Sequence, residues 1–248
     1  MIAATQSLPT LEQRIAATRR PDGSPVMYQN WGKLLFMHWR VPAEMLRPHI
    51  PIGIDIDTFE GNAFIAVTPF TLWGARPRFL PPLPWLSNFH EMNVRTYVHR
   101  DGVPGVWFFS LDANRLIPVA GARALYRLRY VSATINFKHD GRECDYKLER
   151  DAPAGRFQAA WTMRDPLPKA EPGSLEYFLT ERYTLYTESG GKLFRARIHH
   201  EPWPLQNVDL HSWDTDIFAA DGLETPAGEP MVHGGGPVHV AVWPLESI

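Results

Sequence analysis

Short runs of alternating apolar and polar residues, separated by glycine and proline, dominate this chain. Period-two runs rich in β-branched and aromatic residues are typical of strands. The Asp140-Gly141 and Gly190-Gly191 dipeptides favour tight hairpin turns. The pattern predicts strands over residues 34–39, 63–72, 89–99, 106–112, 124–137, 143–149, 157–163, 193–200 and 238–243.

Helical periodicity is confined to three segments. The clearest is 172–186, where Leu175, Phe178 and Leu179 recur at spacings of three and four. Shorter helices are predicted over 42–49 and 10–20. Many strands and few helices predict one mainly β domain over residues 1–248. We expect an antiparallel sheet, curled or closed into a barrel, with a few flanking helices.

Composition narrows the classes of partner and of compartment. The 248 residues carry 25 Lys plus Arg against 27 Asp plus Glu, which gives a net charge of -2. The chain therefore lacks the excess of basic residues that binding to a nucleic-acid backbone requires. The longest uncharged stretch, 230–245, is shorter than the roughly 20 residues of a membrane span. No secretory signal is recognised, and we expect a cytoplasmic protein. A lone Cys144 excludes an intramolecular disulfide.

The strand at 89–99 has two chemically distinct faces. Side chains alternate along a strand, so Glu91, Asn93 and Arg95 share a face opposite the apolar one. The next strand, 106–112, is apolar on both sides in its middle, which indicates cover on both faces. We therefore expect the polar face of 89–99 to line an enclosed pocket. The alternative is that it forms the solvated side of a half-exposed sheet.

The turn between these strands sets which residues lie opposite one another. A two-residue turn at Asp101-Gly102 is assumed. A slip of one residue would move Asp112 to the other face. The predicted cross-strand pairs are Glu91 with Asp112, Asn93 with Ser110, and Arg95 with Phe108.

These positions supply the candidate site. Glu91 is the candidate general acid/base, and Arg95 the candidate group for holding a carboxylate or enolate by charge-assisted hydrogen bonds. The candidate substrate-binding residues are Asn93, Ser110, Asp112, Arg123 and Arg40.

Five segments carry a family resemblance. They are LLFMHWRVP from Leu34, NFHEMNVRTYV, GVWFFSLDA, PGSLEYFLTERY and HHEPWPLQ. From about Trp31 to Gln206 the chain resembles the YqjF-like uncharacterised bacterial proteins, which are similar in fold to acetoacetate decarboxylase. The resemblance implies a mainly β, cone-like barrel with an internal pocket, and it matches Glu91 to an acidic pocket residue. It does not by itself supply a reaction.

The resemblance also exposes a missing group. Acetoacetate decarboxylase works through a Schiff-base lysine. The matching stretch here, 117–130, has Arg123, Arg127 and Arg129 but no lysine, and a guanidinium cannot replace the amine. Among the chain's five lysines only Lys33 lies where it could face a pocket. Imine chemistry is therefore not expected.

No motif predicts a metal or a cofactor. His199 and His200 are adjacent, so on a strand they point to opposite faces, and no HExxH spacing occurs. We read the acidic and histidine residues from 209 to 216 as solvated loops, and His233-Gly-Gly-Gly as a flexible turn. Glycine-rich nucleotide motifs are absent from the sequence.

Three classes of function remain open. The first is a lysine-independent lyase or hydrolase acting on a small oxo-acid-like metabolite. The second is a non-catalytic module that binds or senses a small ligand. The third is a structural or interaction protein whose pocket is filled by its own side chains. The expected partner is a small molecule, and homo-oligomerisation is left open.

Overall fold

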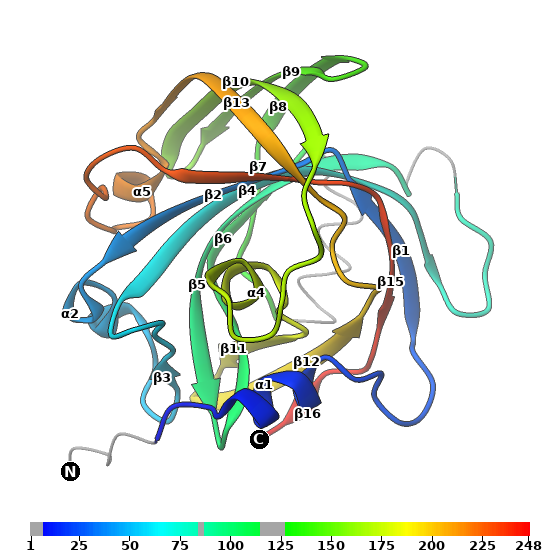
Figure 1. Cartoon of the computed structure of the whole chain (residues 1–248). Coiled ribbons are helices and arrows are strands. Elements are labelled where there is room, and N and C mark those ends of the chain that lie inside the picture. The colour runs from blue at the N-terminus through cyan, green and yellow to red at the C-terminus, as the bar shows by residue number, and fades with distance from the viewer. Residues whose placement is uncertain (1–6, 84–86, 115–126) are drawn as a thin grey trace.

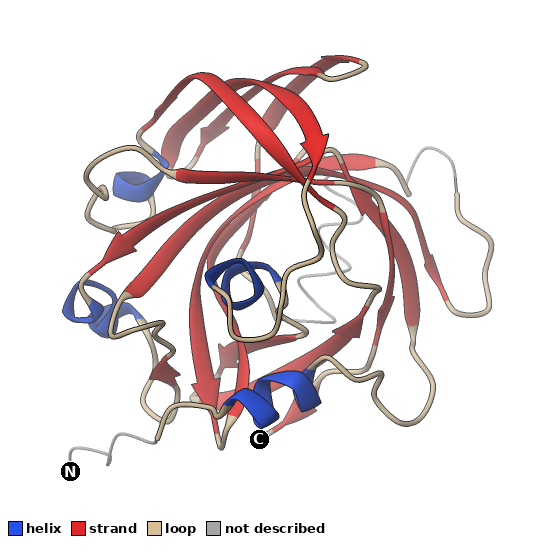
Figure 2. Ribbon diagram, in the orientation of Figure 1, coloured by secondary structure: helices blue, strands red, loops and turns tan. Residues whose placement is uncertain are grey.

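A curled sheet of 16 strands builds most of this protein (Figures 1 and 2). The computed structural model describes residues 7–83, 87–114 and 127–248. The strands are β1 (Met27–Gly32), β2 (Leu34–Val41), β3 (Asp55–Ile56), β4 (Ala63–Pro77), β5 (Phe89–Arg100), β6 (Val103–Ala113), β7 (Tyr130–Ser132), β8 (Thr134–Asp140), β9 (Glu143–Asp151), β10 (Ala154–Pro166), β11 (Thr184–Ser189), β12 (Lys192–His199), β13 (Leu205–Thr215), β14 (Met231–Gly235), β15 (Val238–Val242) and β16 (Glu246–Ser247).

Strand β4 pairs with strands on both of its edges, and this pairing closes part of the sheet into a ring. Its 15 residues pair with β2 and β1 on one edge and with β5 on the other. The order β5-β6-β11-β12-β15-β1 then returns to β4, and β2 carries the sheet outward through β14, β13, β10, β9 and β8. Strand β6 pairs in parallel with β11 and β7, whereas the other pairs of named strands are antiparallel. The predicted mainly β, curled sheet with a few flanking helices is confirmed, and it differs from the prediction in being mixed rather than purely antiparallel.

The helices are short and flank the sheet (Figure 2). They are α1 (Leu11–Ala17), α2 (Ala43–Leu46) with the 3-10 turn η1 (Arg47–His49), α4 (Leu175–Thr180) and α5 (Ile217–Ala220). Thr10 and Gln13 form a capping box at the start of α1. Phe178 of α4 packs on Phe64 and Tyr97, so this helix covers part of the inner face of β4 and β5. No helix in the described ranges is long and apolar enough to cross a bilayer.

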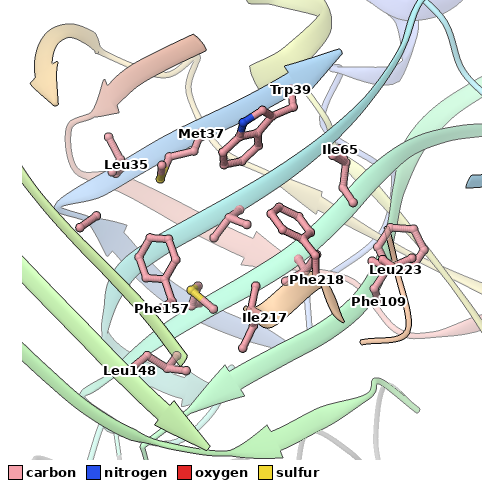
Figure 3. Close-up of a cluster of buried hydrophobic side chains, with 14 of the residues drawn as sticks. Leu35, Met37, Trp39, Ile65, Phe109, Leu148, Phe157, Ile217, Phe218 and Leu223 are labelled. Atoms are coloured by element: carbon pink, nitrogen blue, oxygen red, sulfur yellow. The ribbon is translucent and has the colours of Figure 1, made fainter. Parts of the chain in front are cut away.

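The largest apolar core lies on the outer face of the curl, under β9, β10 and α5. Met92 and Val94 of β5 contribute to it, as the alternating pattern predicted. In Figure 3, Trp39 of β2 and Ile65 of β4 face Phe218 of α5 across this core. Burying this face of β5 leaves the other face turned to the inside of the curl.

A bulge changes the register of the β5–β6 hairpin. Near the turn Arg95 pairs with Phe108, as predicted. Beyond it Val94 pairs with Ser110, so Phe109 is an extra residue in β6. The predicted pairings of Glu91 with Asp112 and of Asn93 with Ser110 are therefore wrong. Their actual partners are Ala113 for Glu91 and Leu111 for Asn93.

Several predicted elements need correction. The predicted 172–186 helix ends at Thr180, and its last residues belong to β11. The predicted 124–137 strand is two strands, β7 and β8, and residues 124–126 lie outside the described part of the chain. Strand β13 replaces the solvated loops expected after residue 209, and β14 replaces the flexible turn expected at His233. Strands β1, β3, β11, β13, β14 and β16 were not predicted.

Candidate functional site

A cavity of about 730 Å³ lies inside the curl. Its walls are formed by a ring of strands in the order β4, β5, β6, β11, β12, β15 and β1, in which β1 pairs with β4. The end of β4 and the 78–83 segment that follows it supply part of the lining. Most of the lining is apolar, and the polar groups include the row Glu91, Asn93 and Arg95 on the inner face of β5.

Glu91 is a buried carboxyl that accepts a hydrogen bond from Tyr130. The Tyr130 hydroxyl donates a hydrogen bond to its Oε2 over 3.1 Å. Burial raises the pKa of Glu91 to about 8; the Tyr130 hydrogen bond opposes this rise and the charge of Asp112 adds to it. Glu91 is therefore largely protonated at neutral pH, a state in which it can give a proton to a ligand.

Polar atoms without partners lie beside Glu91. Asn93 pairs across the strands with Thr68 of β4. The buried Oδ1 of Asn93, the Oγ1 of Thr68, and the Nε and Nη2 atoms of Arg95 have no hydrogen-bond partner within the described residues. Buried polar groups are normally satisfied, so this cluster of exceptions calls for an explanation.

The charge of Arg95 is not balanced by a carboxylate of the described residues. Across residues 7–83, 87–114 and 127–248, no acidic side chain lies within ion-pair distance of its guanidinium. The guanidinium instead lies over the rings of Phe36 at 5.4 Å and Tyr97 at 5.9 Å. With Glu91 largely protonated, this part of the cavity is electropositive, which favours an anionic ligand.

A second arginine in the lining is held by an ion pair. Arg182 donates to Asp57 at 2.6 Å, and Arg14 of α1 donates to both oxygens of the same carboxylate. Burial raises the pKa of Asp57, but the two arginines outweigh this effect and hold it below its ordinary value. The Arg182 guanidinium also packs over Tyr97 at 5.0 Å, so Tyr97 contacts both Arg182 and Arg95.

His200 lies among aromatic rings in the cavity wall. It stacks on Tyr183 with ring centroids 4.6 Å apart and lies 4.9 Å from Trp203. Burial lowers the pKa of His200 to about 4, although a hydrogen bond to the Glu201 carbonyl opposes this change. This histidine is therefore neutral at physiological pH.

Ser110 and Asp112 do not face the cavity. The bulge at Phe109 places them on the other face of β6, against the core, where Ser110 donates to Asp221 at 2.6 Å and Asp112 lies 3.3 Å from Arg150. Burial raises the pKa of Asp112 to about 7, with Arg150 opposing the rise. The prediction that these two residues bind ligand is corrected: they belong to a buried polar network in the core.

The remaining predicted residues lie elsewhere. Arg40 is exposed near the end of β2 and does not line the cavity, so its expected role in binding is also corrected. Arg123 lies outside the described residues. Lys33 is exposed and contacts His139, and none of the five lysines, all within the described part, lines the cavity.

The histidine and acidic side chains of the C-terminal third are spread over separate surroundings. His211 contacts Thr162, and Asp216 accepts from the Arg156 backbone. His233 lies on β14, with its ring 6.4 Å from that of His38. Within the ranges that the structure describes, no group of three or more His, Cys, Asp or Glu side chains could hold a metal ion.

Four residues of the site were missed from the sequence: Thr68, Tyr130, Arg182 and His200. Thr68 had an available signal, since its strand was predicted and its face follows from alternation. Arg182 and His200 lie just before β11 and just after β12, where only the tertiary fold decides direction. Tyr130 lies beside Glu91 because β7 pairs in parallel with β6, and no local sequence pattern predicts that pairing.

Solved structures share this fold at low sequence identity. The enduracididine biosynthesis enzyme MppR, complexed with the condensation product of pyruvate and imidazole 4-carboxaldehyde, aligns with a TM-score of 0.63 and 12% identity over 91% of this chain and 90% of its own. An acetoacetate decarboxylase aligns with a TM-score of 0.62 and 14% identity, over 94% of this chain and 91% of its own. An acetoacetate decarboxylase-like enzyme from Sphingomonas wittichii RW1 aligns with a TM-score of 0.61 and 11% identity, over 91% of this chain and 94% of its own. These likenesses establish an acetoacetate decarboxylase-like fold.

Sequence relatives confirm the resemblance drawn from the motifs. The uncharacterized protein YqjF of Bacillus subtilis (strain 168) is 40% identical over 227 residues, which cover 91% of this chain and 93% of the relative. The family described as an uncharacterized conserved protein, DUF2071, matches residues 28–238. The chain therefore belongs to the DUF2071 family, together with YqjF.

Proposed function

We propose that this protein binds a small organic acid of the oxo-acid type inside the curl and that Glu91 moves a proton on the bound ligand. The observation that carries the proposal is the row Glu91, Asn93 and Arg95, which turns into a cavity of about 730 Å³. Arg95 binds the carboxylate through its Nε and Nη2, which have no hydrogen-bond partner among the described residues.

The chemistry follows from the protonated state of Glu91. With a pKa of about 8, its carboxyl donates a proton to the ketone oxygen of the ligand while the C–C bond from the neighbouring carbon to a carboxylate or acyl group breaks, and the electron pair of that bond forms the enol C=C. The detached group leaves as CO2 in a lyase, or as a carboxylic acid after water has added to it in a hydrolase. The Glu91 carboxylate then takes the enol O–H proton while water protonates the enol carbon, which gives the ketone product and restores the starting state. This sequence needs no amine, in keeping with the absence of lysine from the described lining, and it fits a lyase or a hydrolase.

A non-catalytic binding or sensing module is the second candidate. The absence of a nucleophilic amine from the described lining favours it, because the same cavity could hold an acid without changing it. The third class, a structural protein with a filled interior, is disfavoured by the open volume.

The test is a thermal-shift screen of oxo acids and related acids on the wild type and on Glu91→Gln, followed by NMR detection of product. An acid that stabilises both proteins and is converted only by the wild type supports an enzyme. An acid bound by both and converted by neither supports a binding module. If no acid shifts the wild type, the proposal is wrong.

A second measurement checks the chemistry. Incubation with a ketone and borohydride should leave the protein mass unchanged, because no lysine in the described ranges faces the cavity. A stable adduct on any lysine would contradict the lysine-independent mechanism.

A further inference from the structure

His200 presents an uncharged hydrogen-bond acceptor in the cavity wall. Its Nδ1 lies 2.7 Å from the backbone carbonyl oxygen of Glu201, and a carbonyl can only accept, so Nδ1 carries the ring hydrogen. The ring stays neutral at physiological pH because burial lowers its pKa to about 4. Its Nε2 therefore keeps a lone pair, and it is the nitrogen left for a ligand.

The aromatic surroundings hold this ring in place. Tyr183 and Trp203 pack on His200 at 4.6 and 4.9 Å. Both are fixed by Glu181, whose carboxylate accepts from the Tyr183 hydroxyl and, at 3.1 Å, from the Trp203 backbone nitrogen. A buried, fixed acceptor that lines a cavity is the kind of group that discriminates ligands with a donor from those without one.

His200 and Arg95 lie at separate positions in the same cavity. The guanidinium of Arg95 lies over Phe36, whose ring meets that of Trp203 at 5.4 Å, and Trp203 in turn contacts His200. In the ring of strands around the cavity, β6 and β11 separate β5 from β12 on one side, and β4, β1 and β15 separate them on the other, so Arg95 and His200 belong to opposite parts of the wall. The volume of about 730 Å³ is of the size that holds a molecule much larger than a short acid.

The wall between the two groups is hydrocarbon. Apolar side chains from several strands contribute to it, among them Leu34, Phe70, Leu72, Val106, Leu185 and Ile198. The lining continues to Leu80 and Leu83, which are 58% and 49% exposed. Apolar contact therefore extends from the interior to the surface, as an apolar ligand would require.

From these observations we infer that the ligand has two polar ends: an acid with an extended apolar body, its carboxylate on Arg95 and a terminal hydroxyl or N–H donating to Nε2 of His200. This inference rests on the proposed function and adds the ligand class and a specificity-determining residue. The apolar body contributes affinity, and His200 selects the donor at its end.

The test is a calorimetric series of 2-oxo acids of increasing length, from 2-oxobutanoate through 2-oxohexanoate and 2-oxooctanoate to 2-oxodecanoate. Each is compared with its counterpart bearing a terminal hydroxyl. We expect affinity to rise up to about fourfold per methylene until the body fills the cavity. At the length that reaches His200, the hydroxyl compound should bind about fivefold tighter than the plain acid.

Variants separate the roles of the two ends. His200→Phe keeps an aromatic ring but removes the acceptor, so the preference for the hydroxyl should disappear while the plain acids still bind. His200→Gln, which retains an acceptor, provides a second variant should the first fail to fold. His199→Gln is the matched control, because His199 does not line the cavity, and it should leave the preference unchanged.

The outcomes distinguish the inference from the function beneath it. If acids bind in an Arg95-dependent way but neither length nor a terminal hydroxyl matters, the two-ended ligand is wrong and the proposed function stands. The same holds if His200→Phe keeps the preference for the hydroxyl. If Arg95→Met binds every acid as the wild type does, the proposed function itself fails.

Discussion

The carboxyl groups of Glu91 and Asp112 lie on opposite faces of the β5–β6 hairpin, Glu91 in the cavity and Asp112 in the core. Burial raises both pKa values, to about 8 for Glu91 and about 7 for Asp112; the charge of Asp112 adds to the rise at Glu91, and the charge of Asp221 adds to the rise at Asp112. The β5–β6 hairpin therefore carries two carboxyls whose pKa values lie well above the usual range of a carboxyl, one in the cavity and one in the core.

Glu91 should make stability fall as pH rises. Its folded pKa of about 8 is above the unfolded value of 4.5, so between these pH values the unfolded chain releases a proton that the folded protein keeps. Each pKa unit is worth about 1.4 kcal/mol, so the free energy of unfolding should drop by several kcal/mol over this window. Urea denaturation from pH 5 to 8 measures the slope.

Glu91→Gln should flatten that slope, because the amide does not titrate. Asp112→Asn is the comparison, and it should remove a smaller part of the slope, ending near pH 7. A Glu91→Gln slope equal to that of the wild type would mean that this carboxyl is ionised in the folded protein.

Arg95→Met should stabilise the ligand-free protein. Within the described part of the chain, the Arg95 guanidinium has no counter-charge and two of its nitrogen atoms have no hydrogen-bond partner, and an apolar side chain of similar length removes that cost. We expect a gain of about 1 kcal/mol together with at least tenfold weaker binding of acids, a trade between stability and function. Arg40→Met, at an exposed position on β2, should change neither property; a destabilised Arg95→Met that binds acids normally would refute the assignment.

Arg150→Met should destabilise the core and spare the cavity. Arg150 lies 2.8 Å from Asp221 and 3.3 Å from Asp112, and all three side chains are buried. Removing the cation leaves two buried carboxyls, at a cost of about 3–5 kcal/mol measured by chemical denaturation. The exposed Arg156 gives the matched control, since Arg156→Met should cost less than about 1 kcal/mol.

Asp57→Asn should weaken both α1 docking and the cavity lining. The Asp57 carboxylate holds Arg14 of α1 and Arg182 of the lining, each at 2.6 Å. We expect a loss of about 3–5 kcal/mol, because Arg182 would stay buried without a counter-charge, and faster hydrogen exchange in α1. Asp55→Asn, a partly exposed neighbour, should cost less than about 1 kcal/mol, and equal effects of the two substitutions would contradict this role.

Stability should also depend on Asp57 at low pH. Its folded pKa lies below the unfolded value, so its contribution is present above the unfolded pKa and is lost as pH falls through the folded one. Acid denaturation of Asp57→Asn should lack this part of the transition.

Local patterns predicted the strands that alternate strongly and the face of β5 that turns inward. Glu91, Asn93 and Arg95 could be placed on one face because side-chain alternation along a strand is fixed by backbone geometry. Strands β13 and β14 were missed because their sequences are polar or glycine-rich. Gly234 has no side chain because Met163 packs where one would lie, a contact visible only in three dimensions.

The cavity's second polar group could not be read from the sequence. His200 and Arg95 are 105 positions apart in the chain, and they line the same cavity because β12 and β5 belong to one curled sheet.

The wrong register predicted for the β5–β6 hairpin also reflects a feature that the sequence does not mark. A bulge inserts one residue into β6 without any glycine or proline to mark it, so alternation counted from the turn fails beyond Phe109.

The extra residue at Phe109 decides which side chains of β6 face the cavity and which face the core. Before it, Val106 and Phe108 line the cavity, and after it, Ser110 and Asp112 enter the core network. Without the bulge, Ser110 would pair with Asn93 and Asp112 with Glu91, so both side chains would turn to the cavity and an acidic group would move from the core into the ligand chamber. A relative that lacks one residue here would lose the bulge and still keep Ser110 and Asp112 on the core side, whereas a relative of full length without the bulge would present them to the ligand.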